Sequence, residues 1–383
     1  MNTENITIEG FGKASRGFDN AETTVIMNTN AQPLAWDGIA GCRSFSNHVT
    51  VSEAAAEVGA NYEVKKHHLI SISDELYEAI TNHTPLTQEL LSVDNIVSSH
   101  MATVREDSGK VLGVVGKDYG VVQNAASMEF FNHILNGDIS GNGEKAVIST
   151  AGILDEGGRF YITAKMNSDL HIHGDNTPIE DYLLLTNTHD GSGSVTVLFT
   201  PIRVICRNTL MAALGHAKNK LVYRHTSRVN ERMDLTNEIN FKRAAEVLKF
   251  HETYKKAFVE DLERLREIKL TNIEIMDMAC RIFADEKEMK EIKAHNYKLD
   301  GITTDILSTR KKNLIMSLME SIDYGVGQDT NRGTGLFAYN GITTWANNGR
   351  AYKDNESKFD SIIAGDMAKK TQLMHDMILE YAN

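Results

Sequence analysis

Residues 191–230 contain no aspartate or glutamate, although the 383-residue chain holds 52 acids and 40 bases. An arginine guanidinium can grip two phosphate oxygens at once, whereas a carboxylate in the same place would repel them. This interval therefore predicts a binding site for a polyanion. Its candidate contact residues are Arg203, Arg207, Asn208, Lys218, Lys220, Arg224, His225 and Arg228, with His216 nearby.

Asn208 belongs to this set because the sequence predicts a helix that begins there. Asn208 or Thr209 can cap that helix, so its free N–H groups and the positive end of its dipole would lie beside Arg207. The alternative is that the bases of 191–230 pair with acids on helices later in the chain, since surface ion pairs are common.

The motif His171-Ile-His173 offers a different chemistry, because alternate residues of an extended segment lie on the same side. A metal ion held there would need a third ligand, such as His189 or Asp190, but two alternating histidines near a loop are more often simply exposed. His189 and Asp190 with Ser192 resemble a nucleophile triad only in order along the chain. A tight hairpin turn explains these three residues better, since a triad requires adjacency in space.

Other catalytic and cofactor motifs are missing from the sequence. The glycine-rich stretches 137–143 and 325–335 lack the lysine of a phosphate-binding loop, and neither HExxH nor GxSxG occurs. We therefore expect no catalytic residue, no bound metal, no cofactor and no turnover.

The elements that would position the basic interval are antiparallel hairpins. Two short strands are expected around Lys117-Asp118, followed by a helix over 125–135. Further hairpins should turn at Asp155–Gly158 and at Asp190-Gly191, an Asp-Gly pair suited to positive φ. A short helix with Ser52 as its cap is expected near the N-terminus.

Helical spacing replaces this pattern after residue 236. Apolar residues recur at Phe258, Leu262 and Leu265, as they do earlier at Phe241, Ala245 and Leu248. The sequence TNIE at 271–274 is a capping box, and a helix should follow the glycine-rich loop at 325–335. The predicted organisation is a polar N-terminal arm (1–65), a β-rich α+β core (66–232) and a mainly helical C-terminal region (233–383). The fold class is thus α+β, with antiparallel hairpins and packed helices.

Composition and charge limit the partners and the cellular compartment that we expect for this chain. A net charge of −12 argues against indiscriminate coating of DNA, although it permits a local basic site. The three cysteines form no CxxC pair, which favours a reducing compartment. No run of eighteen apolar residues or signal-like start occurs, so we expect a cytoplasmic protein of a bacterial host cell and no membrane partner.

Several motifs resemble one known family. The segments GKVLGVVGKDYGVVQN, STAGILDEGGRFYITAKM, DYLLLTNTHDGSGSV, FTPIRVICRNTL, YRHTSR and GTGLFAYNGITTW are similar, in this order, to phage/plasmid-like proteins with domain of unknown function 932. The resemblance covers about residues 30–350 and implies residence on a phage, prophage or plasmid, but it brings no catalytic residues. A looser analogy relates the hairpins and the basic helix start to RecT-like single-strand annealing proteins.

The favoured hypothesis is a non-catalytic mobile-element protein that binds nucleic acid, single-stranded DNA above all, in recombination, annealing or replication. Tyr223 could stack on a base, although a half-buried strand position is the better interpretation. We also expect a homo-oligomer, associated through apolar helix faces in 236–325. The alternatives are an anti-defence factor that binds a host protein or a small signalling nucleotide, and a metal-dependent hydrolase that uses His171, His173 and His189.

Overall fold

A computed structural model describes most of the chain. The described residues are 25–28, 43–45, 49–82, 96–136, 146–166, 169–199, 201–203, 208–209, 220–234, 242, 255–363 and 365–382. Their architecture confirms the α+β class, with antiparallel sheets followed by a helical C-terminal region. Within these residues, no helix is both long enough and apolar enough to cross a bilayer.

A seven-stranded sheet forms the centre of the fold, in the order β14-β11-β10-β7-β6-β1-β2. All neighbours pair antiparallel except β1 and β2, which are parallel. The strands are β1 (Val25–Asn28), β2 (Arg43–Phe45), β6 (Val147–Leu154), β7 (Arg159–Lys165), β10 (Tyr182–Thr188), β11 (Val195–Phe199) and β14 (Lys220–Tyr223). Strands β1 and β2 come from the predicted N-terminal arm, so part of that segment belongs to the central sheet.

Two predicted hairpins are confirmed within this sheet. Strands β6 and β7 are joined by a 3-10 turn at Asp155–Gly157, and β10 and β11 are joined through Asp190-Gly191. Gly191 has a φ of 86°, a conformation that glycine adopts without strain. The expected hairpin at Lys117-Asp118 is wrong in its second strand, because Tyr119 makes only an isolated bridge to Thr226.

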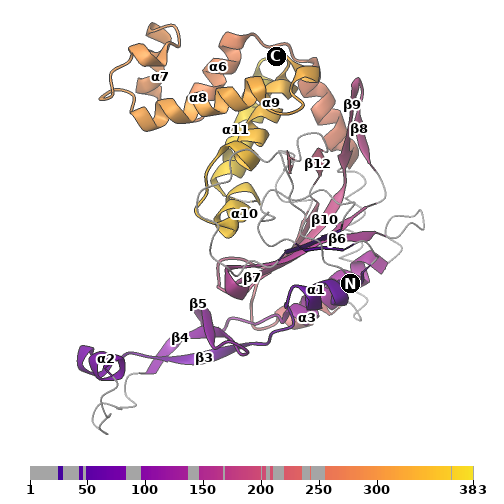
Figure 1. The fold of residues 1–383 in the computed structure, drawn as a ribbon, viewed down its shortest axis with the longest axis vertical. Helices are drawn as coiled ribbons and strands as arrows, with labels where there is room; N and C mark the ends of the chain where they lie inside the picture. The colour runs from indigo at the N-terminus through magenta and orange to yellow at the C-terminus, as the bar shows by residue number, and fades with distance from the viewer. Residues whose placement is uncertain are drawn as a thin grey trace.

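Helices cover both faces of the sheet (Figure 1). Helices α1 (Val51–Glu57) and α3 (Asn124–Asn136) pack on one face, where Phe160 and Ile162 point into their core. Tyr161 points the opposite way, into a second core made with the C-terminal helices. This alternation follows from the two-residue period of a strand, and helices on both faces leave nearly every residue of β6, β7 and β10 buried.

The cap of α1 differs from the expectation. Thr50, not Ser52, caps this helix, and its hydroxyl accepts from the backbone N–H of Glu53. The Glu53 carboxylate accepts from the Thr50 backbone in return, which completes a capping box that begins two residues earlier than predicted.

The C-terminal region is helical, as predicted. The capping box of Thr271 and Glu274 is confirmed, and Phe258, Leu262 and Leu265 are buried on a helix over 255–267. Residues Phe241, Ala245 and Leu248 lie outside the described residues. The other helices are α6 (Asn272–Arg281), α7 (Glu286–Ala294), α8 (Thr309–Tyr324), α9 (Gly335–Thr344), α10 (Asn355–Ile363) and α11 (Asp366–Glu380).

A three-stranded sheet projects from this body with helix α2 (Asp74–Thr81) at its outer end (Figure 1). Its strands, in the order β3-β4-β5, are β3 (Val64–Ile70), β4 (Ile96–Arg105) and β5 (Lys110–Gly116). We call β3–β5 the projecting sheet. A small four-stranded sheet contains β8 (Leu170–Ile172), β9 (Asp175–Glu180), β12 (Ile202–Arg203) and β13 (Asn208–Thr209).

Candidate nucleic-acid interface

Four exposed bases follow one another at intervals of four residues along the edge of the seven-stranded sheet. Lys220 and Arg224 lie on and just after the edge strand β14, and Arg228 and Arg232 lie on the short helix α4 (Val229–Met233) and its cap. We call Lys220, Arg224, Arg228 and Arg232 the basic strip. The strand part and the helix part of the strip lie close together, because α4 packs against β14.

The strand geometry explains why these bases face solvent. Leu221 points into the core beneath α1 and α3, so its neighbours Lys220 and Val222 point away from that core. On α4 the buried residues are Val229 and Met233, which leaves Arg232 exposed. The apolar positions of β14 and α4 thus fix the direction of the basic side chains.

None of the four bases forms an ion pair with another described residue. Buried bases elsewhere do: Arg159 lies 2.7 Å from Asp360, and Lys255 lies 3.2 Å from Asp181. The alternative that the bases of 191–230 pair with acids on the C-terminal helices therefore does not hold for the strip within the described residues. Three of the strip residues were predicted, and none of the four has an ion pair among the described residues, although the exposed acids Glu231 and Asp234 are close to them in the chain.

The other predicted contact residues are placed differently. Arg203 and Asn208 are cross-strand partners in the β12–β13 pair. Asn208 thus lies in strand β13, and residues 210–219, over which the predicted helix would run, lie outside the described residues. Arg207 and Lys218 lie outside the described residues.

His225 is buried and anchors the strip. Its ring stacks on Tyr119 with centroids 4.7 Å apart, and Nδ1 donates to the Gly120 carbonyl over 3.0 Å. Burial lowers the pKa of His225, against the opposing effects of the Gly120 carbonyl and of Asp190. A neutral, buried ring cannot serve as an exposed phosphate contact, so His225 acts as a positioning residue for Arg224 and Arg228.

His189 lies deeper in the same region. Its Nε2 is 2.9 Å from Asn124 Oδ1, and Asn187 donates to the same oxygen over 3.0 Å. Burial, followed by the charge of His225, lowers the pKa of His189 to about 3. Both imidazoles are thus neutral at ordinary pH, and they form a buried polar cluster under the strip.

This cluster also joins the projecting sheet to the body. Thr103 on β4 donates to the His189 carbonyl over 2.6 Å, and Tyr119 donates to the Thr188 carbonyl over 3.1 Å. Gly113 on β5 lies so close to Asp190 that a Cβ atom there would meet the Asp190 carbonyl oxygen at 2.3 Å. The turn at Asp190-Gly191 is therefore a docking point for β4 and β5.

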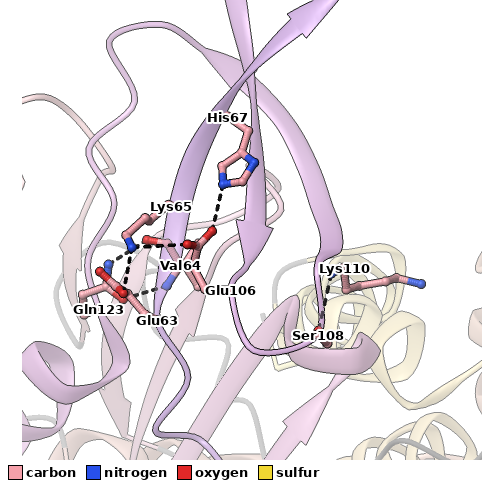
Figure 2. A network of polar contacts seen from close by, with 8 residues as sticks. All are labelled: Glu63, Val64, Lys65, His67, Glu106, Ser108, Lys110 and Gln123. Carbon is pink, nitrogen blue, oxygen red and sulfur yellow. Dashed lines mark hydrogen bonds and ion pairs between the residues drawn. The ribbon is translucent and has the colours of Figure 1, made fainter. Parts of the chain in front are cut away.

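The base of the projecting sheet is charge-balanced and unsuited to phosphate. Figure 2 shows Glu106 between Lys65 and His67, at 3.2 and 2.8 Å, with Glu63 also on Lys65. Hydrogen bonds from His67 and then Lys65 lower the pKa of Glu106. A surface depression of about 490 Å³ beside this network is lined by Glu63, Glu106 and Asp107. These carboxylates would repel a polyanion, so this depression is not a candidate nucleic-acid interface, in contrast to the basic strip.

The hydrolase alternative has little geometric basis. His171 and His173 are exposed near β8, whereas His189 is fully buried in the central sheet. The described residues contain no cluster of three or more His, Cys, Asp or Glu side chains suited to a metal ion. Ser192 donates to Asp190 over 2.7 Å inside the turn, so these residues form a hairpin turn, as predicted, and not a nucleophile triad.

The sequence predicted the position of Tyr223 but did not identify Arg232. Tyr223 is half-buried and packs edge-to-face on Phe130, with centroids 5.2 Å apart, so the strand interpretation of Tyr223 is confirmed. Arg232 was missed because Glu231 closed the acid-free interval. The four-residue spacing that continues through Arg228 could have identified it.

Comparison with known proteins gives one match. Residues 111–363 match the family described as Domain of unknown function (DUF932). No curated protein and no solved structure matches the chain. The matched range includes the turn at Asp190-Gly191, the basic strip and most of the C-terminal helices.

Proposed function

The chain belongs to the DUF932 family, whose description names no activity, and we propose from the geometry that it binds nucleic acid along the basic strip. The observation that carries the proposal is the row of four exposed bases without an ion pair among the described residues, in a chain of net charge −12. Phosphate contacts of this kind supply affinity without sequence information. The setting we propose is recombination, annealing or replication on a phage, prophage or plasmid, in line with the motif resemblance.

Single-stranded DNA is the ligand we favour. A duplex is read by a helix or a ribbon that enters a groove, whereas α4 is only five residues long and lies against β14. The strip therefore has no free helix or ribbon that could enter a groove of a DNA duplex. A flexible single strand can instead follow the edge of the sheet and place successive phosphates beside Arg224 and Arg228.

Contacts in this proposal go to phosphates more than to bases. Tyr223 is an aromatic residue directly before Arg224 in the chain, and its ring packs on Phe130. Stacking on aromatic side chains is the usual source of base contacts in single-strand binding. We therefore expect little sequence preference.

Fluorescence anisotropy with a labelled single-stranded 30-mer tests this function. Arg224→Ala and Arg228→Ala should each weaken binding roughly fivefold to tenfold, which is about 1–1.4 kcal/mol for a lost phosphate contact. Arg264→Ala is the matched control, because Arg264 is exposed on the helix over 255–267, away from the strip. Equal binding by both strip variants and wild type would show that the strip is not the interface.

A duplex of the same sequence provides the second comparison. We expect weaker binding to the duplex than to the single strand at equal salt. Tighter binding to the duplex would retain the strip as the interface but contradict the choice of single-stranded DNA.

A further inference from the structure

The outer end of the projecting sheet exposes large apolar side chains. Ile70 is 61% exposed, Tyr77 61%, Ile96 48% and Ile72 39%. Ile70 and Ile96 are direct partners across β3 and β4, so they lie side by side on one face. An apolar group of this kind at the end of a projecting element is characteristic of an interaction surface.

Charges are ordered along the same segment. Near its start, β3 carries Lys66, whereas the neighbouring Lys65 is paired with Glu63 and Glu106; the apolar Leu69, Ile70 and Ile72 follow, and α2 then presents exposed Asp74, Glu75 and Glu78. These three acids form no ion pair with any other described residue. The segment from Lys66 to Glu78 is thus basic, then apolar, then acidic.

Strand β3 is also an edge strand. The backbone N–H and carbonyl of Val64 point away from β4, because both are bonded to the side chain of Gln123 (Figure 2). By alternation, the backbone groups of Lys66 and His68 point the same way, and no described residue pairs with them. Edge lysines and the bulge at His68/Leu69 discourage indiscriminate backbone pairing, so a partner at this edge is selected by side chains of matching charge.

We propose that two copies of the chain associate through β3 and α2 around a two-fold axis near Ile70. A basic–apolar–acidic segment is self-complementary when antiparallel: apolar residues meet at the axis, and Lys66 of each copy faces the acids of the other. This is the requirement for an isologous dimer interface. The surface differs from the helix faces in 236–325 on which self-association was predicted, because Phe258, Leu262 and Leu265 are buried within the chain.

Light scattering on the full chain tests the dimer. Wild type should have twice the chain mass of 42.6 kDa at micromolar concentration, and Ile70→Asp should reduce this to a single chain. Ile273→Asp is the matched control, because Ile273 is 66% exposed on α6, far from β3 along the chain. Circular dichroism establishes that each variant is folded. A wild-type mass of one chain, or any assembly that Ile70→Asp leaves intact, overturns the proposal.

Charge exchange supplies the sharper test. Lys66→Glu and Asp74→Lys should each dissociate the dimer, and the double variant should restore it, since each interface then again pairs opposite charges. Failure of the double variant to recover the dimer contradicts the proposed register. Binding of single-stranded DNA by monomeric Ile70→Asp is measured separately, because the basic strip lies on other elements and its function does not depend on this interface.

Discussion

His189 and His225 each carry their ring proton on the nitrogen that faces an oxygen. Gly120 offers His225 a carbonyl, which can only accept, so Nδ1 of His225 is protonated. Asn124 donates through its amide nitrogen to the Ala60 carbonyl, so its Oδ1 is the acceptor for Nε2 of His189. The other nitrogen of each ring is a buried lone pair without a partner among the described residues. Any further proton must therefore enter a buried position that has no acceptor among the described residues.

Acid should destabilise the fold through His189. Its pKa is about 3 in the folded chain and about 6.5 in an unfolded one, so the unfolded state binds the proton first as the pH falls. Stability is therefore complete above about pH 6.5 and declines towards pH 3, by up to about 1.4 kcal/mol per pH unit for this group. Urea unfolding at pH 7.5, 5.5 and 4.5 should show a shallower decline in His189→Gln. His171→Gln, at an exposed histidine, should match wild type, and an equal decline in all three proteins would contradict the assignment.

Among the elements, the segment that carries Arg224 and Arg228 depends on close contact with Gly120. A Cβ atom at Gly120 would meet the backbone oxygen of Thr226 at 2.1 Å. Gly120→Ala should therefore displace this segment, lower single-strand affinity roughly as much as the loss of an arginine, and cost about 1–3 kcal/mol of stability. Gly116→Ala is the control, because nothing lies within 4 Å of its added methyl group. Anisotropy and thermal unfolding measure both effects, and normal binding by Gly120→Ala would mean that the strip needs no such positioning.

How far the sequence predicts these elements depends on the range of the interactions that form them. The turns at Asp155–Gly157 and Asp190-Gly191 and the capping box at Thr271 were predictable, because each is fixed by a few neighbouring residues. Asn208 was not, since its strand exists only through pairing with Arg203. The burial of His225 depends on Tyr119, more than a hundred residues away, and no local pattern reports it. Composition identified the basic interval, whereas the structure was needed to show which of its residues are exposed.

At the scale of the whole molecule, the proposed function places a nucleic acid under two opposing charge effects. The formal charge of −12 would repel it at long range, while the basic strip would attract it. The acids at Asp74, Glu75 and Glu78 lie at the outer end of the projecting sheet, on a different element from the strip. Salt screens distant charges more completely than charges in contact. The response of binding to salt should therefore report the number of strip residues in contact with phosphate.

We expect the logarithm of the single-strand association constant to fall with the logarithm of salt concentration with a slope of about −3. Each phosphate neutralised on a single strand contributes about −0.7, and the strip offers four bases. Arg224→Ala should reduce the slope by about 0.7 along with the affinity, since one counterion fewer is released. Glu78→Gln, which removes a distant repulsion, should change affinity slightly and leave the slope as in wild type. Titrations between 50 and 200 mM NaCl, a range over which counterion release changes affinity strongly, measure these slopes. A slope that Arg224→Ala leaves unchanged would mean that Arg224 touches no phosphate, and the interface would then have to be sought elsewhere on the chain.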